Sequence, residues 1–183
     1  MPEKIKQLQI DHGNISRLLE LLREQTAHLE AGEYTDLQLI ADIMHYFVNY
    51  PDIQHHPRED LIFIALSEKH PQVAAIVDEL ENEHKTMAED SQVIFEEIKQ
   101  MQGNAIIPRD KVVTDLKNYI DNYYLHIDKE ETNLFSLALD TLDESDWEKI
   151  DNQLQFAEDP LFGKILNDQY ASIYKVILSG VGN

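Results

Sequence analysis

Apolar residues recur every three or four positions along four long stretches of the chain, a spacing that predicts amphipathic helices. Breaks near Gly32, near Pro71 and between Gly103 and Pro108 separate these stretches. In chain order, the four stripes are Ile5, Leu8, His12, Ile15, Leu19 and Leu22; Ile40, Met44, Phe47, His55, Glu59, Ile62 and Leu66; Val73, Val77, Leu80, His84, Met87, Ser91, Ile94, Ile98 and Met101; and Val112, Leu116, Tyr119, Tyr123, His126, Glu130, Leu134 and Leu137.

The breaks between the stretches are short, so consecutive helices are expected to be antiparallel neighbours. We therefore predict an all-α fold in which residues 1–140 form an up-down-up-down four-helix bundle. Within the second stretch, Pro51 and Pro57 predict a kink or a short break in the helix. They do not predict its end, because the apolar pattern resumes at Leu61.

Residues 141–183 are predicted to form a helical extension that packs on the outside of the bundle as part of the same domain. Residues 143–156 carry the apolar positions Trp147, Ile150 and Leu154. Asp159 followed by Pro160 is typical of a helix cap and a first-turn proline. A last helix is therefore expected over residues 161–178.

Potential metal ligands interrupt each apolar stripe. His12 interrupts the first stripe, His55 with Glu59 the second, His84 the third, and His126 with Glu130 the fourth. The two His–Glu pairs are spaced four residues apart, so both side chains of a pair lie on one face of the helix.

These interruptions are expected to lie at one height in the bundle. His12 is 21 residues before the first turn near Glu33, and His55 is 22 residues after it. His84 and His126 are each 21 residues from the third turn near Ala105. At about 1.5 Å of rise per residue, the remaining mismatches amount to one helical turn or less. All six side chains should therefore meet in one layer of the core.

Six imidazoles and carboxylates buried together without partners would cost several kcal/mol each. Bound metal removes this cost, and these ligand types suit iron, zinc, copper or manganese. Two carboxylates surrounded by several histidines suit a pair of metal ions in a helical bundle. The pattern therefore predicts a metal centre with two ions.

The composition of the chain excludes several kinds of metal site and several kinds of partner. The chain has 183 residues, no cysteine and a net charge of −20. Disulfides, iron–sulfur clusters and thiolate metal sites are excluded. The acidic surface makes nucleic acid an unfavourable partner. No signal peptide and no stretch of about 20 apolar residues is visible, so we expect a cytoplasmic protein without a membrane partner.

The segment Tyr50–Asp60, with His55, His56, Glu59 and Asp60, resembles the HHxxED motif of bacterial hemerythrin-like proteins with the HHE cation-binding domain. The Asp11–His12 and Glu83–His84 pairs, and His126 followed by Glu130–Glu131, are similar to the other motifs of that family. The resemblance implies a non-haem, carboxylate-bridged pair of iron ions. His12 and His55 would bind one iron, His84 and His126 the other, and Glu59 and Glu130 would bridge them.

The chain departs from the oxygen-carrying hemerythrins at two places. Those proteins have another histidine one turn before the residue matching His84, where this chain has Leu80. They also have a fourth-helix aspartate five residues after its histidine, where this chain has Glu130 four residues after His126. The second iron is therefore expected to lack one ligand, and either water or His56 could fill that position.

The resemblance implies binding of dioxygen or a related small oxidant, nitric oxide or peroxide, for sensing, storage or stress defence. A di-iron oxidase or peroxidase is the first alternative, and an iron storage or donor protein is the second. Zinc or manganese could replace iron in recombinant protein. The sequence leaves both a monomer and a homodimer open.

Overall fold

The computed structural model describes residues 3–153 and 157–180, and within these ranges every regular element is a helix. The helices are α1 (Glu3–Ala31), α2 (Leu37–Asn49), the π-helical η1 (Pro51–His55), α3 (His56–Lys69), the 3-10 helix η2 (Pro71–Val73), α4 (Ala74–Gln102), α5 (Arg109–Glu130), the π-helical η3 (Glu131–Phe135), α6 (Ser136–Thr141), α7 (Glu144–Asp151), the 3-10 helix η4 (Asp168–Tyr170) and α8 (Ala171–Gly180). The predicted all-α class is confirmed.

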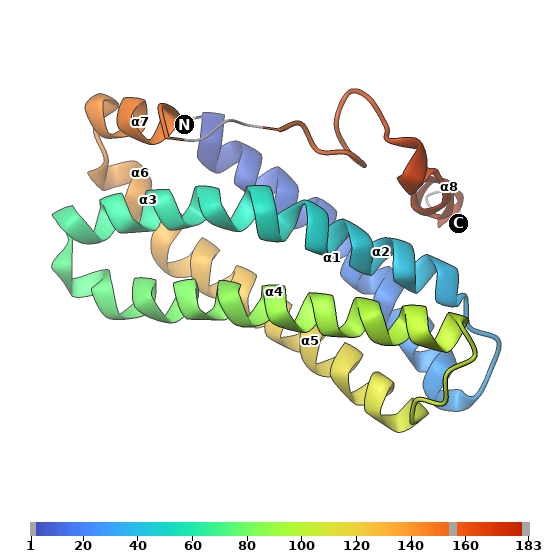
Figure 1. Cartoon of the computed structure of the whole chain (residues 1–183). Coiled ribbons are helices and arrows are strands. Elements are labelled where there is room, and N and C mark those ends of the chain that lie inside the picture. Colours follow the sequence, from blue (N-terminus) through green and yellow to red (C-terminus); the bar gives the residue numbers. More distant parts are fainter. Residues whose placement is uncertain (1–2, 154–156, 181–183) are drawn as a thin grey trace.

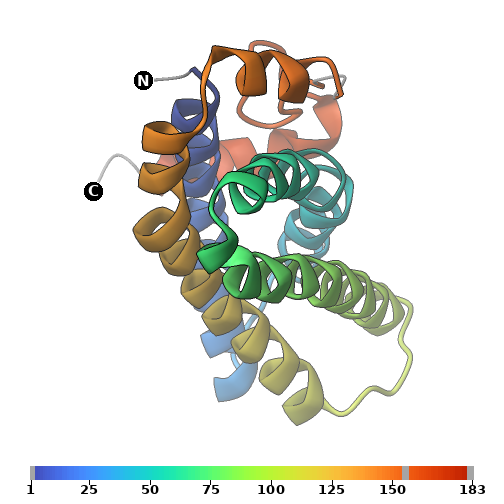
Figure 2. The same cartoon turned by 90° about the vertical axis from the view of Figure 1, so that its left-hand side faces the viewer.

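The long helices form a bundle. Helix α1 packs along α5, α2 and α3 pack along α4, and α4 packs along α5. The chain reverses direction at the three predicted breaks (Figure 1), and the end-on view shows the helices grouped around a common interior (Figure 2). At the first break Gly32 adopts a positive φ of 71°, a conformation that ends helices readily. Asp36 then caps α2 by accepting a hydrogen bond from the Leu39 amide at 3.0 Å.

The prolines of the second stretch mark a π-helical turn at Pro51–His55, which joins α2 to α3 without ending the helical direction. The predicted kink or break is thus confirmed. A second π-helical turn, Glu131–Phe135, follows α5 and was not predicted. Each π turn adjoins a helix that carries a site glutamate, Glu59 on α3 or Glu130 on α5. Such turns occur frequently at functional sites.

A layer of polar side chains divides the hydrophobic core into two clusters. One cluster lies toward the α3–α4 turn and includes Leu8, Ile62 and Leu80. The other includes Ile15 and Tyr123 and continues to the opposite end of the bundle. The predicted ligands lie between these clusters along the chain. They are therefore enclosed by apolar packing above and below.

The C-terminal extension lies against the outside of the bundle, where α7 contacts α3 and α8 contacts α2 (Figure 1). The predicted helix over residues 161–178 is wrong in its first half, since α8 begins only at Ala171. Asp159 instead accepts hydrogen bonds from the amides of Leu161 and Phe162 at 2.8 and 2.9 Å, which fixes a turn rather than a helix start. Leu154 and Phe156 of the predicted preceding segment lie outside the described residues.

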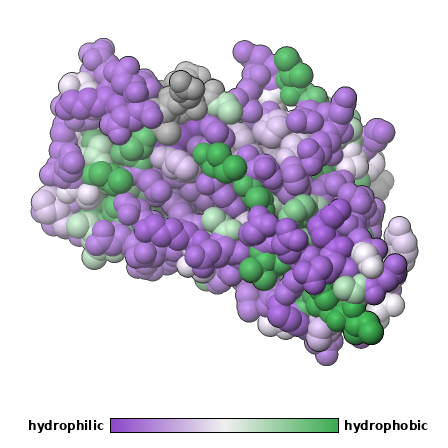
Figure 3. All heavy atoms as spheres, viewed as in Figure 1, coloured by the Kyte–Doolittle hydropathy of each residue, from purple (hydrophilic) through white to green (hydrophobic). Residues whose placement is uncertain are grey.

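The hydrophilic character of the surface agrees with the net charge of −20. Figure 3 shows a mostly hydrophilic face on which hydrophobic residues form small separate patches. Among the described helices, none is long and apolar enough to cross a membrane.

Candidate metal centre

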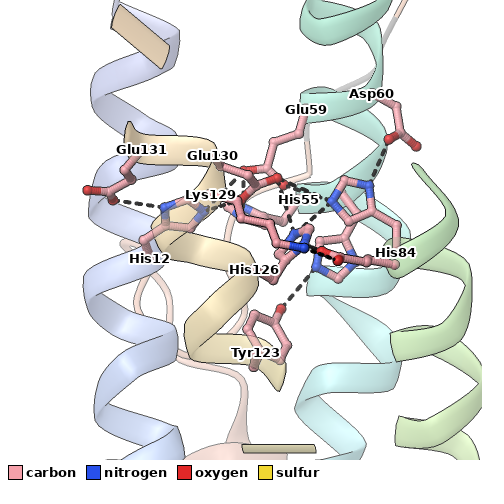
Figure 4. Close-up of polar contacts among 12 residues, drawn as sticks. His12, His55, Glu59, Asp60, His84, Tyr123, His126, Lys129, Glu130 and Glu131 are labelled. Atoms are coloured by element: carbon pink, nitrogen blue, oxygen red, sulfur yellow. Dashed lines mark hydrogen bonds and ion pairs between the residues drawn. The ribbon is translucent and has the colours of Figure 1, made fainter. Parts of the chain in front are cut away.

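The structure brings all six predicted residues into one buried layer (Figure 4). They come from every long helix of the bundle: His12 from α1, His55 and Glu59 from η1 and α3, His84 from α4, and His126 and Glu130 from α5. Each is at most 5% exposed, and the two glutamates are fully buried. The convergence inferred from equal distances to the turns is therefore what the fold produces.

Glu59 lies between the histidines of both sides. Its Oε1 atom is 3.0 Å from His12 Nε2 and 3.2 Å from His55 Nε2. Its Oε2 atom is directed the other way, 3.6 Å from Nε2 of His84. The two oxygens of one carboxylate are thus divided between two groups of imidazoles.

Glu130 repeats this arrangement from the opposite helix. Its Oε2 atom is 3.3 Å from His12 Nε2. Its Oε1 atom is 3.3 Å from His84 Nε2 and 3.2 Å from His126 Nε2. Both glutamates therefore span the same two positions, one beside His12 and the other beside His84.

Each of the four histidines directs Nε2 inward and is held at Nδ1 by an outer carboxylate. Such pairs fix the orientation of an imidazole and increase its basicity as a metal ligand. The Nδ1–oxygen distances are 2.9 Å for His12 with Glu131, 3.4 Å for His55 with Asp11, 2.7 Å for His84 with Asp60, and 2.9 Å for His126 with Glu83.

Sequence reasoning did not assign roles to these outer carboxylates. Each one adjoins a predicted ligand in the sequence, as Asp11 adjoins His12 and Glu83 adjoins His84. Adjacency was the available signal, but it does not give the partner. Asp11, for example, contacts His55 on another helix rather than its neighbour.

His56, the possible additional ligand, is also buried in this layer at 2% exposure. Its ring stacks on that of His84, with centroids 4.4 Å apart and planes 10° apart. One of its ring nitrogens lies within 4.8 Å of ligand atoms of Glu59, His84 and His126. Its Nε2 atom is also 3.0 Å from the Tyr123 hydroxyl. His12, His55 and Glu59 form a second group, whose ligand atoms also lie within 4.8 Å of one another.

Charge pairing within the layer shifts the pKa values of its members. Burial acts to lower the pKa of His84, but hydrogen bonds with Asp60 and Glu130 raise it to about 10. Burial likewise opposes protonation of His12, yet contacts with Glu130, Glu131 and Glu59 raise its pKa well above the ordinary value. His56 differs, because burial and the nearby charge of His84 lower its pKa to about 4. The His56 imidazole is therefore neutral at pH 7.

The residues present fit a pair of metal ions. The Oε2 atoms of Glu59 and Glu130 are buried without a hydrogen-bond partner among the described residues. Buried carboxylate oxygens are rarely left in this condition, since their desolvation is costly. Imidazole nitrogens and carboxylate oxygens form the donor set that iron, zinc and manganese accept. Bound cations would satisfy these oxygens and the inward-facing nitrogens together.

An all-helical bundle with such a buried His–Glu layer defines a metal-binding helical protein. The model of the hemerythrin HHE cation-binding domain family matches residues 3–138, and the chain belongs to this family. The match covers α1 to α5 and ends within α6, before the C-terminal extension begins. No curated protein and no solved structure matches the chain at a significant level.

Proposed function

We propose that the protein holds two iron ions in an up-down-up-down four-helix bundle. His12 and His55 would bind one iron, His84 and His126 the other, and Glu59 and Glu130 would bridge them. The observation that carries this proposal is the division of each glutamate's oxygens between the two groups of imidazoles. A single ion would not require two carboxylates in that arrangement.

We further propose that the centre binds a small oxidant such as dioxygen, nitric oxide or peroxide. When bound, the iron pair would supply redox chemistry and a position for such a ligand. The chain's own residues prepare the site for it. The outer carboxylates hold the imidazoles with Nε2 inward, and buried side chains such as Leu80 and Phe135 exclude bulk water from the layer.

His56 would be a fifth protein ligand of the second iron, beside His84, His126 and the two bridging glutamates. The geometry supporting it is the group formed by His56, Glu59, His84 and His126. Leu80, by contrast, is fully buried in the apolar cluster on one side of the layer and offers no ligand atom. His56 would therefore compensate for the histidine that oxygen carriers have at the position of Leu80.

The test is metal analysis of anaerobically purified protein, followed by optical spectra on exposure to air, nitric oxide or peroxide. Two irons per chain would support the paired centre, and a charge-transfer band that appears with dioxygen, nitric oxide or peroxide would support oxidant binding. Fully loaded protein with one metal would contradict the paired centre, and no spectral response to any of the three ligands would contradict oxidant binding.

Two other functions predict different results when the same iron-loaded protein is tested. An oxidase or peroxidase would consume peroxide steadily when a reductant is supplied. An iron storage or donor protein would lose its iron quickly to a chelator while remaining folded. The enclosed position of the site favours a resident centre over a labile store, because every predicted ligand is at most 5% exposed.

A further inference from the structure

The environment of His56 matches that of the four other histidines of the layer at one ring nitrogen and differs at the other. Each of those four rings holds Nδ1 against a carboxylate and directs Nε2 into the layer. The Nδ1 atom of His56 likewise lies 3.4 Å from Oδ1 of Asp52. Its Nε2 atom, however, lies 3.0 Å from the hydroxyl oxygen of Tyr123. His56 is therefore arranged like a metal ligand whose binding nitrogen has a second partner.

Asp52 is placed to fix which nitrogen of His56 carries a hydrogen. Its side chain is only 7% exposed, and its Oδ2 atom accepts a 2.6 Å hydrogen bond from the hydroxyl of Ser91, a fully buried residue of α4. Neither Asp52 Oδ1 nor His56 Nδ1 has a hydrogen bond to any other described residue. An ionised carboxylate can only accept hydrogen bonds, so the hydrogen belongs on Nδ1 where the two atoms face each other.

A hydrogen on Nδ1 leaves a lone pair on Nε2, and two different partners can use this lone pair. The phenol of Tyr123 can donate its hydrogen to it. A metal ion can bind it instead, since neutral imidazole binds metals through the nitrogen without a hydrogen. Tyr123 is fully buried on α5, and Figure 4 shows its hydroxyl directed toward the imidazoles of the layer. The hydroxyl therefore competes with a metal for Nε2 of His56.

We propose that His56 is an exchangeable ligand, whose Nε2 atom alternates between the Tyr123 hydroxyl and the second iron. Asp52 is then a positioning residue, because its contact with Nδ1 keeps Nε2 free of hydrogen in both arrangements. His56 held by Tyr123 leaves a coordination position for a small external ligand, and His56 bound to the metal closes that position. The proposal rests on the proposed function, since it assigns a regulation to the same centre.

Tyr119 provides a matched comparison for Tyr123 within the same helix. It lies one helical turn before Tyr123 on α5 and is 1% exposed, and the two rings have centroids 5.6 Å apart. Both rings also contact that of Phe47. The Tyr119 hydroxyl has no hydrogen-bond partner among the described residues. Replacing either tyrosine by phenylalanine removes one buried hydroxyl, but only Tyr123→Phe removes a partner of His56.

The first test uses metal-free protein. Nitrogen NMR distinguishes imidazole nitrogens with and without a hydrogen, and the His56→Ala variant identifies the signals of this ring. We expect the hydrogen of His56 on Nδ1, with Nε2 as a hydrogen-bond acceptor. Tyr123→Phe should shift the Nε2 signal, whereas Tyr119→Phe should leave it unchanged. A hydrogen on Nε2 would overturn the role of Asp52, and an Nε2 signal insensitive to Tyr123→Phe would overturn the competition.

The second test measures the affinity of iron-loaded protein for azide, followed by its charge-transfer band. Tyr123→Phe removes the competitor for Nε2, so His56 should close the position more often and azide should bind more weakly. The expected factor is about two- to tenfold, which corresponds to the net contribution of one hydrogen bond. Tyr119→Phe should bind azide like the unmodified protein. Equal azide affinities of Tyr123→Phe and the unmodified protein would overturn the exchange.

A variant of Asp52 tests the positioning role in the opposite direction. Asp52→Ala removes the acceptor for Nδ1, so the hydrogen can move to Nε2 and block metal binding there. Azide should then bind more tightly, as it should in His56→Ala. Asp90→Ala removes the carboxylate next to Ser91 on α4 and serves as the control, with unchanged azide affinity. If Asp52→Ala does not fold, Ser91→Ala releases the Asp52 carboxylate and should act in the same direction. An unchanged affinity in the folded variant would overturn the positioning role.

Failure of the proposed function gives a different result from failure of the exchange. Protein that holds fewer than two metals, while NMR shows the Nδ1 hydrogen and the Tyr123 contact, would contradict the paired centre and the exchange together. Only the positioning of His56 by Asp52 would then stand. Protein with two irons in which Tyr123→Phe and Asp52→Ala both leave the azide affinity unchanged would contradict the exchange and leave the paired centre intact.

Discussion

The Nε2 atoms of His84 and His126 lie 3.0 Å apart although the two residues come from different helices. Outer carboxylates hold the opposite nitrogen of each ring, Asp60 for His84 and Glu83 for His126. In metal-free protein, one of these nitrogens can donate a hydrogen bond to the other. In the proposed metal-bound form both nitrogens would be unprotonated and would bind the same ion, and the predictions below follow from this difference.

Replacing Glu59, one of the two proposed bridging carboxylates, should reduce metal content. Glu59→Gln keeps the size of the side chain but removes the charge that would join two cations, so we expect fewer than two irons per chain. Glu79→Gln, a surface change at a residue that contacts Lys129, is the control and should retain both. Metal analysis of the two purified variants provides the measurement. Full loading of Glu59→Gln would rule out a bridging role.

Removing the metal should lower the melting temperature. The metal-free protein leaves carboxylate oxygens of Glu59 and Glu130 buried without hydrogen-bond partners among the described residues. A metal that binds only the folded state stabilises it by mass action, on the order of 4 kcal/mol at a thousandfold excess over Kd. The expected loss is on the order of 10 °C. Calorimetry before and after chelation measures it, and equal melting temperatures would argue against a buried site.

Metal binding should release protons. Burial acts to lower the pKa of His84, but Asp60 and Glu130 raise it to about 10, so this imidazole is protonated at pH 7 in metal-free protein. The ligating form is neutral, and a metal must therefore displace the proton. Apparent metal affinity should rise as pH increases from 6 toward 9. Titration calorimetry in two buffers of different ionisation enthalpy checks this, since a heat independent of buffer would mean no proton is released.

Loss of an outer carboxylate should weaken the site without removing a ligand. Asp60 accepts a 2.7 Å hydrogen bond from His84 Nδ1 and is part-exposed, so Asp60→Asn should fold. Changes at such positions cost about 10- to 100-fold in metal affinity. Competition with a chelator gives the affinity, and Glu79→Gln serves again as control. An unchanged affinity would show that the Asp60 contact does not tune His84.

The six-residue layer could be predicted because two independent features of the sequence agree, the helical spacing of the apolar positions and the distances of the ligands from the turns. Helical spacing selects His12 and His126 as members of apolar stripes, and equal distances to the turns place them at one height. Neither argument depends on how the helices are rotated in detail. The buried positions of both residues in one layer follow directly from the pattern.

Features that depend on contacts between helices were beyond that reasoning. Asp11 is next to His12 in sequence, but the rotation of α1 directs it toward His55. The π turn at Glu131–Phe135 contains no proline or glycine to signal it. The segment after Asp159 has the sequence pattern of a helix start. However, the Asp159 side chain accepts a hydrogen bond from the Leu161 amide, and the Leu161 side chain is buried, so this segment follows an irregular path over the bundle.

The last prediction concerns which residue completes the second metal position. His56 stacks on His84 and lies within 4.8 Å of the other members of its group, whereas Leu80 is packed in an apolar cluster. If His56 is a ligand, His56→Ala should open a position and strengthen azide binding to iron-loaded protein. Leu80→His should place a polar ring in the apolar cluster and reduce metal loading.

The alternative is an iron whose free position is occupied by water. In that case Leu80→His would fill the position, because Leu80 lies four residues before His84 on the same helix face. Azide would then bind more weakly to Leu80→His and equally well to His56→Ala and the unmodified protein. Azide titrations of the three iron-loaded proteins, followed by their charge-transfer bands, separate the two arrangements. The His56 ring lies 4.4 Å from the His84 ring, whereas Leu80 is a fully buried apolar residue without a ligand atom. We therefore expect His56→Ala to be the variant that strengthens azide binding.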